Sequence, residues 1–219
     1  MNKIYHIVPP SNCPICPRLK DFRLNNIALH STWFNAPVPV FQPINGLEKA
    51  KLVIVGLAPG LQGANRTGRP FTGDYAGLLL YSTLVKYGFA HGTYKAAAND
   101  GLSLENTAII NAVRCVPPQN KPLGSEINNC RQFLNPLLHN LPTLKVILAL
   151  GTIAHNTILR SFNLPISQYK FRHNSKYQLN ASSKILISSY HCSRYNTNTG
   201  RLTTQMFHDV FDNIVQNLT

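Results

Sequence analysis

The chain has 219 residues, 44% of them hydrophobic, which is enough to bury one sizeable core and excludes a disordered polar chain. Lysine and arginine number 21 against 8 acidic residues, and the resulting net charge of +13 favours a polyanionic partner, above all nucleic acid. No apolar run approaches the ~20 residues of a membrane-spanning helix, and the first ten residues lack the features of a secretory signal. Five cysteines, an odd number, argue against a disulfide framework, so we expect a cytoplasmic protein.

Short apolar runs that alternate with helical patterns predict an α/β fold with a mostly parallel sheet. Four strands are predicted at 52–57, 108–113, 144–150 and 184–188. Helices are predicted at 75–87, from Ser125 towards Leu138, at 152–160 and at 203–217. Ser125 is expected to cap the second of these helices, and Pro136 to end or bend it. We expect one domain over residues 1–219, with neither repeats nor linkers.

Four of the cysteines form a candidate metal site. Cys13 and Cys16 make a C-x2-C pair in a proline-flanked turn, and Cys115 and Cys130 are candidates for the other two ligands. Fourteen residues separate the second pair, which weighs mildly against a zinc ribbon and is compatible with an iron–sulfur cluster. The alternative is four unrelated cysteines, the first pair being redox-active or accidental. Cys192, in a polar loop, is expected to be a free thiol.

A glycine-rich segment, 56–60, closes the first predicted strand and leads into a polar loop. It matches neither a P-loop nor a dinucleotide fingerprint, and by itself it indicates only an anionic ligand. Of the eight acidic residues, Asp74 alone lies in a loop at the carboxyl edge of the predicted sheet, where such folds bind ligands. Asp74 is equally suited to cap the following helix, and the two roles are compatible.

The segments at this edge resemble the uracil-DNA glycosylase superfamily, most closely its family 5, an iron–sulfur group. The matching stretches are GLAPGLQGANRTGRPFTGD at 56–74, NAVRCVPPQNKP at 111–122, HCSRYNTNTGRLT at 191–203 and CPIC at 13–16. They follow the family's order across the whole chain. Leu57 stands where the related family 4 carries an acid, which favours family 5.

The resemblance implies a three-layer α/β/α sandwich around a four-stranded, mostly parallel sheet. It implies a monomeric repair enzyme that hydrolyses the N-glycosidic bond of uracil in DNA and leaves an abasic site. Hypoxanthine or other deaminated bases are expected as further substrates. It also implies a 4Fe–4S cluster, most simply structural, on Cys13, Cys16, Cys115 and Cys130.

The resemblance further implies a set of base-binding and catalytic residues. Phe71 would stack on the extruded base and Asn111 would pair with its edge, while His191 would stabilise the departing base. Asp74 would orient water or balance the cationic sugar. The substrate-binding residues are then Gly56, Ala58, Phe71, Asn111 and His191. Taken singly, Phe71 suits a core position, Asn111 a loop anchor and His191 a structural histidine.

Four arginines are expected to contact DNA: Arg66, Arg69, Arg194 and Arg201. The loop 193–201 is expected to enter DNA, with Tyr195 as a further contact, although Cys192 replaces the family's proline and predicts a less rigid loop. The first motif offers Leu57, Ala58 and Pro59 where other members of the superfamily activate water. We therefore expect largely dissociative hydrolysis assisted by Asp74 and bound phosphates.

Two other functional classes fit part of the sequence. A non-catalytic nucleic-acid-binding module stabilised by zinc or a cluster explains the charge and the cysteines, but it leaves Asn111, His191 and the block 56–74 without a purpose. An electron-transfer iron–sulfur protein needs no affinity for DNA, so the net charge of +13 would be incidental.

Overall fold

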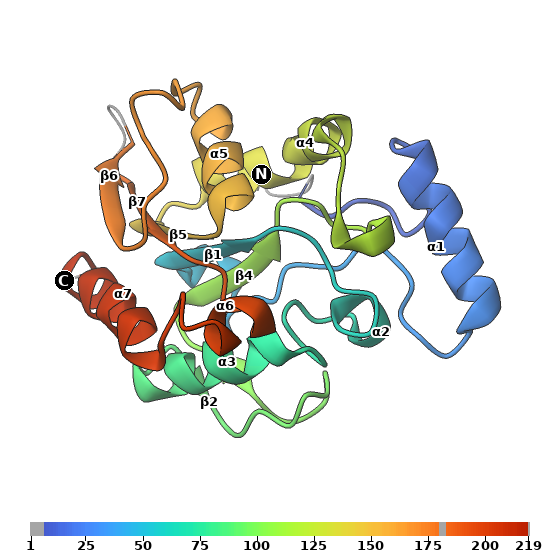
Figure 1. Cartoon of the computed structure of the whole chain (residues 1–219), viewed down its shortest axis with the longest axis horizontal. Helices are drawn as coiled ribbons and strands as arrows, with labels where there is room; N and C mark the ends of the chain where they lie inside the picture. Colours follow the sequence, from blue (N-terminus) through green and yellow to red (C-terminus); the bar gives the residue numbers. More distant parts are fainter. Residues whose placement is uncertain (1–6, 180–182, 219) are drawn as a thin grey trace.

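A five-stranded sheet forms the centre of the protein in a computed structural model that describes residues 7–179 and 183–218 (Figure 1). Its strands are β1 (Leu52–Gly56), β4 (Thr107–Asn111), β5 (Val146–Leu150), β6 (Ser175–Gln178) and β7 (Ile185–Ser189). The strand order is β4-β1-β5-β7-β6, with parallel pairing except between β6 and β7. The four parallel strands are the four predicted ones, each within two residues at either end.

Strand β6 was not predicted, so the sheet has five strands where four were expected. Its sequence, SKYQ, contains no apolar run, and its residues alternate between half-buried and exposed. A short polar strand of this kind suits an antiparallel sheet edge that faces water. A separate two-stranded ribbon, β2 (Ala90–His91) and β3 (Ser103–Leu104), was also not predicted because each strand has only two residues.

Helices cover both faces of the sheet, which confirms the three-layer α/β/α fold (Figure 1). One face is covered by α3 (Tyr75–Lys86) and α7 (Thr204–Gln216), and the other by α4 (Gly124–Asn140) and α5 (Thr152–Ser161). Alternate residues of β1 enter the two cores because side chains along a strand point to opposite faces. No helix in the described ranges is long and apolar enough to cross a membrane.

Helix α4 differs from its predicted form at both ends. Its N-cap is Leu123 rather than Ser125, and the Glu126 carboxylate accepts the Leu123 amide N–H at 2.7 Å. The helix runs past Pro136 to Asn140, so the proline does not end it. Tertiary packing explains this persistence, because Leu134, Leu137 and Leu138 on both sides of the proline are buried in the core.

Helix α1 (Pro17–Leu29) lies at one end of the molecule and was not predicted (Figure 1). Its buried positions are Leu19, Arg23 and Asn26, so the buried face is largely polar and carries no apolar stripe. Leu19 packs against Val113 and Ile127 in a small third core. The remaining short helices are α2 (Ala64–Thr67), α6 (Arg194–Asn198) and two 3-10 turns, Leu47–Lys49 and Pro118–Asn120.

Candidate active site and cysteine site

Three loops that follow β1, β4 and β7 meet at the carboxyl edge of the sheet and enclose a cavity of about 260 Å³. All three predicted blocks contribute to it, as expected for ligand sites in parallel α/β sheets. The lining residues are Ala58, Pro59, Gly60, Ala64, Phe71, Asp74, Tyr75, Ala76, Asn111, Asn120, His191, Ser193 and Arg194. Five of the predicted catalytic and substrate-binding residues are thus brought together: Ala58, Phe71, Asp74, Asn111 and His191.

Gly56 holds two of these residues in place without lining the cavity itself. It pairs with Asn111 where β1 and β4 end. A Cβ atom at Gly56 would collide with Asn111 Oδ1 and lie 2.6 Å from Phe71 Cζ. Glycine therefore lets both side chains approach the end of β1, which is a positioning role rather than the predicted contact with substrate.

Phe71 has a backbone φ of +52° and is only 5% exposed. It belongs to the core cluster beneath α3 and also lines the cavity. Its ring lies 5.7 Å from the His191 ring at an interplanar angle of 30°. Phe71 is therefore a core residue, as one sequence interpretation has it, and also a cavity wall, while its stacking on an extruded base stays a prediction.

Asp74 is the N-cap of α3, and its Oδ1 accepts the Gly77 amide N–H at 3.2 Å. This confirms the predicted capping role and fixes the carboxylate at the cavity wall. A Cβ atom at Gly63 would lie 2.8 Å from Asp74 Oδ2, so the glycine-rich loop closes tightly around the acid. Burial raises the pKa of Asp74, while the amides of Gly77 and Ala76 oppose the shift.

His191 lies two residues after the end of β7 and lines the cavity. Burial lowers the pKa of His191 to about 4, so the imidazole is neutral at pH 7. Its Nδ1 atom is buried and has no hydrogen-bond partner among the described residues. The Asn196 side chain donates to the His191 carbonyl oxygen at 2.8 Å and ties the histidine to α6. The arrangement provides a neutral imidazole next to the aromatic wall.

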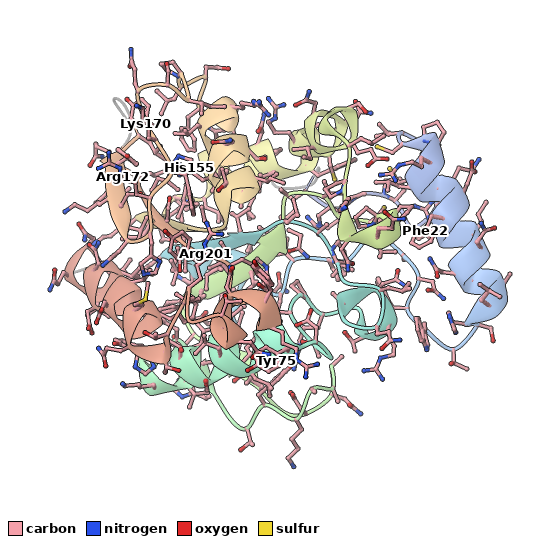
Figure 2. The ribbon with its side chains drawn as sticks, in the orientation of Figure 1. Phe22, Tyr75, His155, Lys170, Arg172 and Arg201 are labelled. Atoms are coloured by element: carbon pink, nitrogen blue, oxygen red, sulfur yellow. The ribbon has the colours of Figure 1, made fainter. Side chains whose placement is uncertain are left out.

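Three of the four arginines predicted to contact DNA are exposed, but they lie in different places. Arg194 lines the cavity, and its guanidinium lies 5.9 Å from the ring centroid of Tyr75, which is labelled in Figure 2. Arg201 is exposed and stacks on Tyr190 at 4.7 Å. Arg66 is exposed, and its Nε donates to the carbonyl oxygen four residues earlier. All three remain available to an external anion.

The predicted contact of Arg69 with DNA is wrong, because its side chain is buried and already paired. The side chain is 5% exposed, and two of its nitrogens donate to the Asp100 carboxylate at 2.8 Å each. Its Nε donates to Thr72 Oγ1 at 2.7 Å. Its guanidinium also lies against three aromatic rings, Phe41, Tyr81 and Tyr94. Arg69 therefore anchors the loop that carries Phe71, and the ion pair holds the pKa of Asp100 well below its usual range.

Tyr75 and Asn120 are among the cavity residues that the sequence analysis missed. Tyr75 is 41% exposed and follows Asp74 directly. Its position beside Asp74, in the first turn of a predicted helix, could have indicated that it lines the site. Asn120 has a φ of +56°, a conformation that asparagine adopts more readily than most residues. Its position inside the matched block 111–122 was a second signal.

Cys192 forms no disulfide with any other cysteine of the described chain, as predicted, but it is not in a polar environment. The side chain is fully buried in the core cluster that also contains Phe207 and Val210 of α7. Burial raises the pKa of this thiol. Cys192 therefore packs as a small hydrophobic residue and is shielded from reagents in solvent.

The four remaining cysteines line a second cavity, which shares none of its lining residues with the first. Cys13 precedes α1, Cys16 is its N-cap, Cys115 follows β4 and Cys130 lies in α4. In residues 7–179 and 183–218, no three histidine, cysteine or acidic side chains form a group that could hold a single metal ion.

Nitrogen donors point at three of these four sulfur atoms. Arg23 Nη1 lies 3.4 Å from Cys115 Sγ, and the Arg114 amide nitrogen lies 3.3 Å from Cys130 Sγ. Asn129 Nδ2 lies 3.7 Å from Cys16 Sγ. Such donors favour negatively charged sulfur, so the donor set fits thiolates held by an electron-poor centre.

Comparison with known proteins gives one family. The family model described as "Uracil DNA glycosylase superfamily" matches residues 43–216, which include all three loops of the cavity. The chain is 40% identical over 203 residues to the type-5 uracil-DNA glycosylase of Thermus thermophilus, covering 90% of each chain.

Further relatives carry the same description or a neighbouring one. The type-5 uracil-DNA glycosylase of Mycobacterium leprae is 37% identical over 210 residues, which cover 92% of this chain and 89% of that protein. The type-4 uracil-DNA glycosylase of Archaeoglobus fulgidus is 34% identical over 137 residues, 62% of this chain and 58% of that protein. The resemblance to family 5 over family 4 is thus confirmed.

Proposed function

The chain belongs to the uracil DNA glycosylase superfamily, and from that premise we propose that it excises uracil from DNA in base excision repair. Water adds to the sugar carbon, the N-glycosidic bond breaks, and the base leaves with the bonding electrons and takes up a proton. The observation that carries the proposal is the convergence of Asp74, Asn111 and His191 on one cavity. A non-catalytic binding module does not account for that convergence.

Base recognition is assigned to Phe71 and Asn111. An enzyme that acts on a base within a duplex must extrude the nucleotide, and an aromatic ring that stacks on the base offsets part of the unstacking energy. The Asn111 amide both donates and accepts, so it matches the adjacent carbonyl and imino groups of uracil. The same amide tolerates other deaminated bases that present a carbonyl beside an N–H, and we include hypoxanthine among the substrates.

Cleavage develops negative charge on the base and positive charge on the sugar, and the cavity offers one group for each. A neutral His191 retains one ring N–H, which donates to the departing base oxygen and stabilises the developing anion. The Asp74 carboxylate, fixed by the first turn of α3, faces the cationic sugar or orients the water. Positive charge from Arg194, Arg66 and Arg201 attracts the phosphates.

We assign a 4Fe–4S cluster to Cys13, Cys16, Cys115 and Cys130, supported by the N–H donors that point at three of their sulfur atoms. When bound, the cluster would supply a structural cross-link between the start of α1, the end of β4 and α4. Because a cysteine site of this kind persists best in a reducing compartment, we place the protein in the cytoplasm, as one domain acting as a monomer.

Single-turnover excision from a labelled duplex with one uracil tests the function. Asp74→Asn keeps the cap, since asparagine caps helices as well as aspartate, but it removes the charge. The variant should excise on the order of 10²–10³-fold more slowly, the usual effect of losing one electrostatic stabiliser. Asp209→Asn, at an exposed position of α7, is the matched control and should excise as the unsubstituted chain does.

Two results would contradict these assignments. Tight binding of the uracil duplex with no release of free uracil would support the non-catalytic module instead. Full excision by Asp74→Asn would leave the activity standing but remove Asp74 from it. Running the assay over hypoxanthine and thymine mismatches measures the base range.

A further inference from the structure

Two arginines beside the four cysteines are buried without a carboxylate. Arg23 is 3% exposed and Arg114 is 1% exposed. The described part of the chain contains two ion pairs between charged side chains, Arg18–Glu126 and Arg69–Asp100, and neither involves Arg23 or Arg114. Buried cations are normally paired, because their transfer out of water is costly.

The side-chain contacts of Arg23 point towards the cysteines. Arg23 bridges two of them, with Nη1 at 3.4 Å from Cys115 Sγ and Nη2 donating to the Cys13 carbonyl oxygen at 3.0 Å. Both guanidinium groups belong to residues that line the same cavity as Cys13, Cys16, Cys115 and Cys130. The negative charge expected opposite these cations therefore lies on the sulfur side of the cavity.

Arg114 is held by backbone oxygen atoms and lacks a full set of partners. Its Nε donates to the Val38 carbonyl at 2.6 Å and its Nη1 to the Ile7 carbonyl at 3.2 Å. Its Nη2 is buried and has no hydrogen-bond partner among the described residues. Neutral carbonyls orient a guanidinium but do not neutralise it.

Glu126 does not serve as a partner for either arginine. Glu126 lies close enough to Cys16 to influence its thiol, but its carboxylate is already bound by Arg18 at 2.7 Å and 2.8 Å. Four neutral thiols would leave two buried positive charges uncompensated. Four thiolates on an iron–sulfur core carry more negative charge than the core carries positive charge, so their net charge has the sign that the arginines require.

We propose that Arg23 and Arg114 are the built-in counter-ions of the cysteine-held centre, and that their positive charge is what retains the centre in the protein. The inference rests on the cysteine assignment of the proposed function, but not on uracil excision. It assigns Arg114 two roles, because its backbone amide contacts Cys130 while its side chain contributes charge. Both arginines act through the sulfur ligands and are therefore positioning residues rather than catalytic ones.

Three variants of the purified holoprotein separate charge from shape. Arg23→Gln removes the charge, Arg23→Lys keeps it, and Arg18→Gln removes a nearby arginine that has its own carboxylate. The readout is release of protein-bound iron to an excess of chelator, followed by loss of absorbance near ~400 nm. Arg23→Gln should release iron on the order of 10–100-fold faster, the usual effect of losing an outer-shell partner, and both other variants within about threefold of the unsubstituted chain.

The reduction potential of the centre gives an independent readout. Loss of a nearby positive charge disfavours the added electron, so Arg23→Gln should have a more negative potential than Arg23→Lys. Arg114→Lys is the second probe if Arg23→Gln does not fold, and it should retain iron because the charge remains.

Three outcomes would overturn the proposal: equal iron release from Arg23→Gln and the unsubstituted chain, equal release from Arg23→Gln and Arg23→Lys, and purified protein with no metal on these cysteines. Uracil excision measured on the same samples keeps the two proposals apart. If the enzyme excises uracil but its iron release does not depend on the charge at position 23, only the counter-ion role is contradicted. If it retains iron tightly but does not excise uracil, only the proposed function is contradicted.

Discussion

The cavity lined by Asp74, Asn111 and His191, here the base cavity, and the cavity lined by four cysteines, here the cysteine cavity, both depend on buried charge. They balance that charge in opposite ways. In the loops that build the base cavity, Arg69 is neutralised by Asp100 and Asp74 is held by a helix amide, so the chain completes the balance by itself. At the cysteine cavity, Arg23 and Arg114 have no acidic partner in the described residues. The first site is pre-organised by the polypeptide, whereas the second, on our proposal, is complete only with an anionic centre.

The largest expected effect comes from breaking the internal balance at Arg69. Arg69→Met leaves the Asp100 carboxylate, whose side chain is 0% exposed, without its partner. Removing one partner of a buried pair should lower the free energy of unfolding by about 3–5 kcal/mol, measured by urea denaturation.

Arg18→Gln is the matched control for Arg69→Met. The Arg18 side chain is 36% exposed, so losing its pair with Glu126 should cost at most about 1 kcal/mol. If both variants lost the same stability, the base site would not depend on its internal ion pair. Adding Asp100→Asn to Arg69→Met should recover part of the loss.

The next effect concerns the neutral His191. Its pKa of about 4 lies below the usual value of about 6.5, so between these pH values the unfolded chain binds a proton that the folded chain does not. Stability should therefore fall as the pH drops from 6.5 towards 4, by roughly 3 kcal/mol from this residue. His191→Gln should lose that part of the acid sensitivity in denaturation measured at a series of pH values.

His91→Gln, at an exposed position, is the control and should keep the acid sensitivity of the unsubstituted chain. A His191→Gln variant with the same pH dependence as His91→Gln would mean that the imidazole is not held neutral by burial. The base cavity would then not keep His191 uncharged through the fold of the chain alone.

The smallest effect sharpens the role of Gly56. In Gly56→Ala the added methyl group meets Asn111 Oδ1 and Phe71 Cζ, so we expect a loss of about 1–3 kcal/mol of stability and a fall in kcat/KM for uracil excision. Gly124→Ala is the control, because a Cβ atom there has nothing within 4 Å. An unchanged kcat/KM in Gly56→Ala would show that Asn111 needs no fixed position.

The parallel strands could be predicted because each contains a run of apolar residues that is buried almost throughout. Asn111 and His191 could be located because the first ends such a strand and the second lies two residues beyond one. Helix α1 was out of reach, since its buried face contains Arg23 and Asn26, which sequence patterns assign to solvent. Arg69 was misjudged because an arginine in a polar loop looks the same whether it meets a phosphate or Asp100, which lies 31 residues away.

The docking of α1 has a consequence for synthesis of the chain. Leu19 packs against Val113 and Ile127, so α1 cannot find its place until about a hundred further residues have left the ribosome. At translation rates of about 5–20 residues per second this delay is roughly 5–20 s, far longer than a helix needs to form. During that interval Leu19 has no packing partner, so the docking of α1 belongs to a late step in the folding of the nascent chain.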